Sequence, residues 1–172
     1  MLNETVQQAL NDQINMELTA FYTYLSMSAY FEDTGMQGFA GWMRHHADEE
    51  MMHAMKLYDW VHTRRGTVKL QSIGAPPATW NSALEAFEDA FKHERKVSIS
   101  IDNLIKTARE QGDNATESFL QWFVDEQVEE EEVVDEVIQK LKLIGDFSGG
   151  LYLLDRELAE SSAATHGEGE EE

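Results

Sequence analysis

Apolar side chains recur along this chain at alternating steps of three and four residues, which is the spacing of one face of an α-helix. Four long segments share this pattern, and none of them contains a proline. A shorter apolar segment runs from Leu151 to Leu158, after the helix-breaking sequence Ser148-Gly149-Gly150. The pattern therefore predicts helices over about residues 3–32, 36–63, 81–109, 114–143 and 149–158.

The connections between these segments predict how the helices are arranged. Short turns join the first segment to the second and the third to the fourth, so each of these pairs is expected to be antiparallel. The middle connection holds the only two prolines, Pro76 and Pro77. At about 17 residues it is long for a helical bundle, and it can cross the bundle from end to end. We expect an all-α four-helix bundle with one long crossover loop and a short fifth helix at the C-terminus.

The C-terminal part of the chain leaves one choice open. The short fifth helix is apolar, so it is expected to pack either on the end of its own bundle or against another subunit. Residues 161–172 consist largely of Ser, Ala, Gly and Glu. This composition predicts a disordered acidic tail, so that the folded domain spans residues 1–160.

Polar residues interrupt all four long apolar stripes near their middles. Carboxylates at one level of a core cannot all stay ionised, because burial and mutual repulsion raise their pKa values. Two divalent cations would balance four such charges, and oxygen and imidazole ligands without thiolate suit iron, manganese or zinc. A buried polar network without metal, or a shifted stripe that leaves the acids on the surface, is the structural alternative. The interrupting residues are Glu17, Glu50, His53, Glu94, Gln127 and Glu130.

Composition narrows the classes of function. The 172 residues include 33 acidic and 13 basic side chains, for a net charge of −20, and no cysteine. This charge argues against nucleic acid and anionic membranes as partners and favours cations. The absence of cysteine excludes disulfides and thiolate metal sites. The first basic side chain is Arg44, and no apolar run is long enough to span a bilayer, so a cytoplasmic protein is expected.

Two stretches of the chain, Arg44 to His53 and Phe119 to Glu131, resemble the ferritins, most closely the bacterial non-haem ferritins. The resemblance extends over about residues 2–160 and implies a ferritin-like di-iron domain. By position, it implies a first iron held by Glu17, Glu50 and His53. Glu50 would bridge to a second iron held by Glu94, with Glu130 and Gln127 nearby.

The same resemblance assigns further residues around this pair. Glu49, Glu126 and Glu129 correspond to a third iron site. Tyr24 and Trp122 correspond to aromatic residues near the centre, with ordinary packing as the alternative for each. Other di-iron proteins carry a second E-x-x-H on the last ligand helix, where this chain reads Gln127-Val128-Glu129-Glu130. The missing imidazole implies a second iron that is held less firmly. The resemblance to non-haem ferritins also implies no haem, with Met51 assigned to packing.

The function implied by the resemblance is iron storage. A ferroxidase centre would oxidise Fe(II) with O2 or H2O2, and a shell of 24 copies would store the ferric mineral. The fifth helix would meet its copies at the four-fold axes. Glu110, Asp113 and Glu117 are candidates for lining pores, with a solvated surface as the alternative. His45, His46 and His62 are expected to be structural or surface residues. A di-metal oxidase or oxygenase, a metal buffer and a helical scaffold remain as competing functions.

Overall fold

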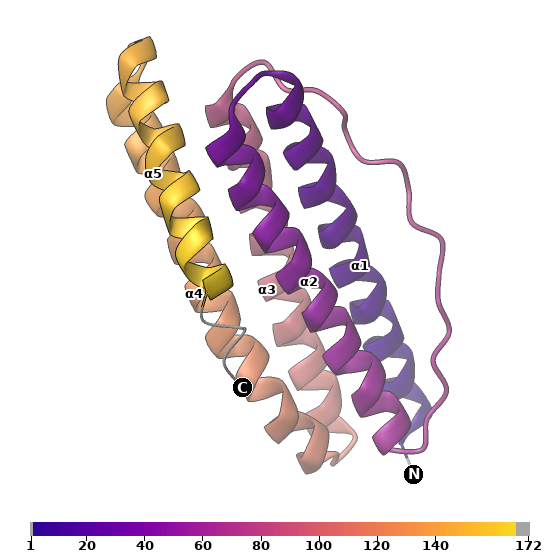
Figure 1. Cartoon of the computed structure of the whole chain (residues 1–172). Coiled ribbons are helices and arrows are strands. Elements are labelled where there is room, and N and C mark those ends of the chain that lie inside the picture. The colour runs from indigo at the N-terminus through magenta and orange to yellow at the C-terminus, as the bar shows by residue number, and fades with distance from the viewer. Residues whose placement is uncertain (1, 168–172) are drawn as a thin grey trace.

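The computed structural model describes residues 2–167, with side chains through residue 161, and confirms the predicted all-α architecture. Four long helices form a bundle, and a fifth lies along its side (Figure 1). None of the helices in the described part of the chain has the length and apolar character that crossing a membrane requires. The helices are α1 (Glu4–Asp33), α2 (Gln37–Thr63), α3 (Ala83–Glu110), α4 (Asn114–Ile144) and α5 (Ser148–Gly167).

Local side chains and glycines define the helix ends. The side chain of Asn3 caps α1, and the hydroxyl of Ser82 caps α3 by accepting from the Glu85 amide at 3.1 Å. The turns after α1 and α3 each contain a glycine with positive φ, 79° at Gly35 and 67° at Gly112. Residues with a Cβ rarely adopt a positive φ, so the two glycines allow the chain to reverse direction within a short turn.

The long connection between α2 and α3 follows the outside of the bundle from one end to the other, as predicted (Figure 1). Hydrogen bonds attach it to α1. The Asn11 side chain donates to the carbonyl of Thr67 at 3.1 Å and accepts from the Lys69 amide at 2.7 Å. Farther along, the Ser26 hydroxyl donates to the carbonyl of Pro77 at 2.6 Å. These bonds satisfy backbone groups of a segment that forms no regular structure of its own.

The hydrophobic core consists of two clusters with a polar layer between them. One cluster includes Tyr24, Ala47 and Val134, and the other includes Ile14 and Leu57. On every long helix, the predicted metal ligands fall between the last residue of one cluster and the first of the other. The core therefore surrounds these polar residues on both sides and holds them at one level of the bundle.

The fifth helix packs on its own bundle, chiefly against α2. Leu154 and Leu158 are buried in the core, and the Asp155 carboxylate accepts from the Phe39 amide at 3.0 Å near the start of α2. A Cβ at Gly38 would lie 1.6 Å from the Asp155 carbonyl oxygen, so this close approach requires glycine. The sequence left open whether α5 packs on its own bundle or on another subunit. Within the single chain, α5 packs on α2 and α4 of its own bundle.

The length of α5 corrects one expectation. The helix continues to Gly167, beyond the predicted end at residue 158. A disordered acidic tail over residues 161–172 stays a prediction. The segment between Leu158 and Gly167 contains alanines and no helix breaker, so the backbone can continue without interruption. The remaining part of the predicted acidic tail, residues 168–172, lies outside the described residues.

Candidate metal centre

The four long helices bring all six predicted ligands of the iron pair to one level of the bundle. Glu17 comes from α1, Glu50 and His53 from α2, Glu94 from α3, and Gln127 and Glu130 from α4. All six residues are buried, and none of them exposes more than 5% of its surface. Glu17, Glu50 and His53 each offer a ligand atom, and these three atoms lie within 4.8 Å of one another.

Three atoms of this group have no hydrogen-bond partner, although all three are buried. They are Glu17 Oε2, Glu50 Oε2 and His53 Nε2. Buried polar atoms are nearly always paired, and an unpaired one costs about 1–3 kcal/mol. Two carboxylate oxygens and one imidazole nitrogen form a donor set that suits a divalent transition-metal ion. The chemistry of the unpaired atoms therefore fits a metal ion.

Hydrogen bonds from neighbouring side chains hold the second oxygen of Glu17 and both oxygens of Glu94. The Gln13 amide donates to Glu17 Oε1 at 2.8 Å, and the Ser100 hydroxyl donates to Gln13 Oε1 at 2.5 Å. The Tyr24 hydroxyl donates to Glu94 Oε1 at 2.6 Å, and the Gln127 amide contacts Glu94 Oε2 at 3.2 Å. These contacts orient Glu17 and Glu94.

Burial shifts the protonation of the whole group. Desolvation raises the pKa of Glu17, Glu94 and Glu130 to about 7, and neighbouring carboxylates add to the shift. Burial likewise raises the pKa of Glu50 well above its ordinary value, with Glu94 and Glu17 as further causes. Burial lowers the pKa of His53 to about 4, so its imidazole is neutral near pH 7. A cation bound among these groups would take the place of their protons.

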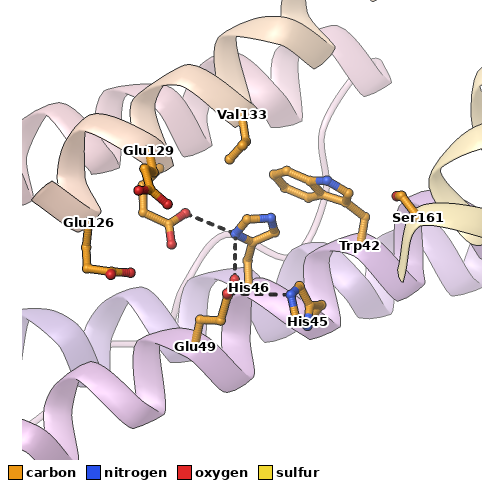
Figure 2. A pocket seen from close by; sticks show the side chains of 9 residues that line it. Trp42, His45, His46, Glu49, Glu126, Glu129, Val133 and Ser161 are labelled. Atoms are coloured by element: carbon orange, nitrogen blue, oxygen red, sulfur yellow. Dashed lines mark hydrogen bonds and ion pairs between the residues drawn. The ribbon is translucent and has the colours of Figure 1, made fainter. Parts of the chain in front are cut away.

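The residues that the resemblance assigns to a third iron site line a pocket beside this centre. The pocket lies between α2 and α4 and has a volume of about 230 Å³ (Figure 2). Glu49 is half-buried, Glu126 is half-buried and Glu129 is exposed, and all three face the pocket. Glu126 Oε2 lies 3.9 Å from His53 Nε2, so the pocket adjoins the metal centre.

His46 was expected to be a structural or surface residue, and the structure places it between the pocket and the metal centre. It is 94% buried, with its Nδ1 atom 3.1 Å from Glu130 Oε2 and 3.3 Å from Glu49 Oε2. The sequence analysis did not predict this position beside Glu130 and Glu49, although His46 lies on the apolar stripe of α2, one turn before Glu50. That position on the stripe was the available signal.

The other singled-out aromatic and acidic residues occupy more peripheral positions. The Trp122 ring lies edge-on to His53 at 5.4 Å, with Lys56 Nζ 3.9 Å from the centroid of the Trp122 ring. Asp113 caps α4 and forms an ion pair with Arg64 at 2.8 Å. Three other residues are placed without a role in the centre: Met51 is half-buried on α2, Glu110 is exposed, and Glu117 forms an ion pair with Arg109.

Known proteins share both the sequence and the fold of this chain. Residues 7–144 match the family described as Ferritin-like domain. A bacterial non-heme ferritin of Bacteroides fragilis is 42% identical over 160 residues, which cover 93% of this chain and 99% of that relative. A bacterial non-heme ferritin of Staphylococcus aureus is 40% identical over 158 residues, covering 92% and 95%. An engineered closed form of the Archaeoglobus fulgidus ferritin has a TM-score of 0.91 at 46% identity, covering 92% of this chain and 97% of that chain. These matches confirm the resemblance, and the chain therefore belongs to the ferritin family of iron-storage proteins.

Proposed function

We propose that this ferritin oxidises Fe(II) within each subunit and stores the ferric product inside a 24-subunit shell. The observation that carries the proposal is the buried layer to which each of the four helices contributes a carboxylate, with Glu17 Oε2, Glu50 Oε2 and His53 Nε2 left unpaired. Iron is the substrate of this site and the cargo of the shell. The cytoplasmic location expected from the sequence remains part of the proposal.

The proposed roles are those that the family resemblance implies, and the shared buried layer of the side chains supports them. Glu17 and His53 hold one Fe(II), Glu94 and Glu130 hold a second, and Glu50 bridges the two. Four carboxylates neutralise two divalent ions, which offsets the repulsion that raises their pKa values. Two Fe(II) give one electron each to O2, which takes up two protons and leaves as H2O2. With H2O2 as oxidant, the same two electrons and two protons yield two water molecules.

Gln127 is proposed to weaken the hold on the second iron. An amide at this position carries no charge, and its nitrogen lies 3.2 Å from Glu94 Oε2 and 3.4 Å from the Ser98 hydroxyl. It therefore orients Glu94 and adds neither a negative charge nor an imidazole to the site. A weakly held ion suits a centre that passes its oxidised product on, whereas a permanent cofactor needs firmer ligation.

Addition of Fe(II) to the metal-free protein in air tests the proposed function. We expect oxidation of more than two Fe(II) per subunit, because the centre empties into a store, with the product remaining soluble and eluting with a large assembly on size-exclusion chromatography. Ferric absorbance and iron content across the column measure both properties. Oxidation no faster than in buffer would refute the ferroxidase, and a 19.6 kDa monomer would refute storage in a shell.

Replacing Tyr24 with phenylalanine tests whether the buried hydroxyl takes part. The Tyr24→Phe variant keeps the aromatic packing but loses the 2.6 Å hydrogen bond to Glu94 Oε1. We expect iron oxidation to slow by roughly tenfold, since a hydrogen bond to a charged group contributes about 1.5 kcal/mol or more. Metal stoichiometry is expected to stay unchanged, and the exposed Tyr22 serves as a matched control. An unchanged rate would show that Tyr24 only fills the core.

A further inference from the structure

Methionine supplies all the sulfur atoms of this chain, because the sequence contains no cysteine. Among the residues that the structure describes, the exposed methionines are Met52 and Met55, which expose 51% and 44% of their surfaces. Both lie on α2 and line a pocket of about 290 Å³ that Trp122 borders from α4. This pocket shares no lining residue with the acidic pocket beside the metal centre.

We propose that Met52, Met55 and the ring of Trp122 form a binding site for a soft monovalent metal ion. Cu(I) is the biological ion of this class, and Ag(I) is its redox-stable analogue. Thioether sulfur is a soft ligand that selects Cu(I), whereas the oxygen and nitrogen ligands of the iron pair suit harder divalent ions. The two sites would therefore sort ions by softness, and binding at the thioethers does not depend on the proposed function.

The spacing of the two methionines along α2 lets both thioethers reach one ion. Residues three apart lie on the same face of a helix, with their Cβ atoms about 5–6 Å apart. Methionine is unbranched and flexible, so its sulfur can adjust its position. Because about half of each side chain is exposed, both can turn without disturbing the core. Rotation of the two side chains is therefore enough to bring both sulfur atoms to one ion.

The ring of Trp122 already contacts a cation in this structure. Lys56 Nζ lies 3.9 Å from the centroid of the Trp122 ring, in a cation–π contact. Tryptophan attracts cations more strongly than the other aromatic side chains do. Lys56 lines the same pocket as the two methionines, so its ammonium marks a place where the ring stabilises positive charge. A soft monovalent ion in this place would contact the ring face as well as the two sulfur atoms.

Two charged side chains of the pocket act on such an ion in opposite directions. Asp59 lies one turn beyond Met55 on α2, and its carboxylate attracts the ion. Lys56 repels the ion and competes with it for the Trp122 ring. Once displaced, the Lys56 ammonium can turn toward Asp59, three residues farther along the same helix. Removal of the Lys56 charge is therefore expected to strengthen binding, whereas removal of a sulfur atom weakens it.

The thioether site and the iron pair contact different parts of Trp122. The rings of Trp122 and His53 meet at 79° with their centroids 5.4 Å apart, whereas Lys56 lies over the Trp122 ring. An ion in place of the Lys56 ammonium therefore leaves the imidazole of His53 available to the metal centre. Both sites can be filled at once, so the buried ligands can be occupied while the thioethers are titrated.

Titration of Ag(I) in the presence of excess Zn²⁺ tests the inference. Zn²⁺ occupies nitrogen and oxygen ligands and leaves the thioethers to the softer ion. We expect calorimetry to show one Ag(I) bound per subunit, and the bound ion to quench part of the tryptophan fluorescence. This quenching should disappear in Trp122→Phe. In crystals, an anomalous silver peak is expected within bonding distance of both sulfur atoms. Cu(I), kept reduced by ascorbate in the absence of air, is expected to bind at the same place.

Three variants separate the contributions of the pocket residues. Met52→Leu and Met55→Leu each remove one sulfur atom and keep an apolar side chain of similar volume. Each is expected to weaken Ag(I) binding by roughly 10-fold or more, since loss of even an indirect support of a metal ligand has an effect of this size. Lys56→Gln removes the charge and should bind Ag(I) roughly two- to fivefold more tightly. Met51→Leu is the matched control, at a half-buried methionine of α2 outside the pocket.

Three outcomes would overturn the proposed site. One is unchanged Ag(I) affinity in both Met52→Leu and Met55→Leu. Another is weaker binding in Lys56→Gln, since the ion would then not share the ring with the ammonium. The last is a silver peak beyond bonding distance of either sulfur atom. Failure of the proposed function is a separate result, because Fe(II) oxidation at the buffer rate would leave Ag(I) binding at the thioethers unchanged.

Discussion

Replacement of His53 by alanine is expected to abolish rapid Fe(II) oxidation while the bundle remains folded. The Nε2 atom of His53 is buried without a hydrogen-bond partner, so its lone pair is available to an ion that also contacts Glu17 and Glu50. Loss of even an indirect support of a metal ligand weakens binding roughly 10- to 100-fold, and loss of the ligand itself should cost at least that much. With one of its two iron positions emptied, the centre cannot remove two electrons together.

Stopped-flow absorbance of the ferric product measures this effect in the first turnover. His62→Ala is the matched control, because His62 lies on the same helix but is exposed. Circular dichroism checks that helicity is retained, since His53 also contacts the rings of Trp122 and Phe123. A fast phase that survives in His53→Ala would show that the oxidation centre lies elsewhere.

The metal-free protein is expected to lose stability as the pH rises from about 6.5 to about 8. In the folded chain, burial raises the pKa of Glu17, Glu94 and Glu130 to about 7, above their ordinary value of 4.5. The folded state therefore holds protons that the unfolded chain has already released. Stability associated with these protons is present at low pH and is lost as the pH rises through about 7.

The buried histidines act in the opposite direction, but only at lower pH. Burial lowers the pKa of His46, His53 and His93 from 6.5 to about 4. Their contribution is present above pH 6.5 and is lost as the pH falls below that value. The two groups therefore oppose each other below pH 6.5, whereas above it the glutamates dominate. The net loss up to pH 8 is on the order of 2 kcal/mol, since each proton contributes about 1.4 kcal/mol per pH unit.

Chemical denaturation of the metal-free protein at several pH values measures this loss. Zn²⁺ is expected to reverse the slope, because metal binding requires ionised carboxylates and releases their protons. In Glu17→Gln the side-chain oxygen can keep the hydrogen bond from Gln13 but cannot ionise, so the slope above pH 6.5 should decrease. Glu132→Gln, at an exposed acid on α4, should leave it unchanged. A metal-free protein whose stability rises between pH 6.5 and 8 would contradict the predicted protonation.

Local sequence predicted most of the bundle because helix formation depends on short-range spacing. The stripes and turn residues placed the four long helices within a few residues of their observed ends, and the crossover was predicted from its length. The exception was α5. Its last turns, up to Gly167, are formed by a weakly apolar segment whose composition predicted disorder. Its position against α2 depends on a contact between Gly38 and Asp155, far apart in the chain, that no periodicity reports.

The predicted ligands show the same difference between what local spacing predicts and what helix packing decides. Glu17, Glu50, Glu94 and Glu130 stand out in the sequence because an acid on an apolar stripe must be buried, and a single buried level of acids implies a compensating cation. His46 also lies on a stripe, but its spacing alone does not distinguish a packed histidine from a ligand. Only the approach of α4 brings Glu130 to 3.1 Å from its Nδ1 atom.

The sequence by itself determined that the chain forms a four-helix bundle with a layer of acids inside, because helical phase is a local property that the spacing of residues records directly. The tertiary structure decided which ligand atoms remain unpaired, in which direction the pKa values of the buried groups shift, and that the outer pocket contains a nitrogen donor. Those properties depend on the separation and burial of atoms from different helices. Such separations arise only when the helices pack together.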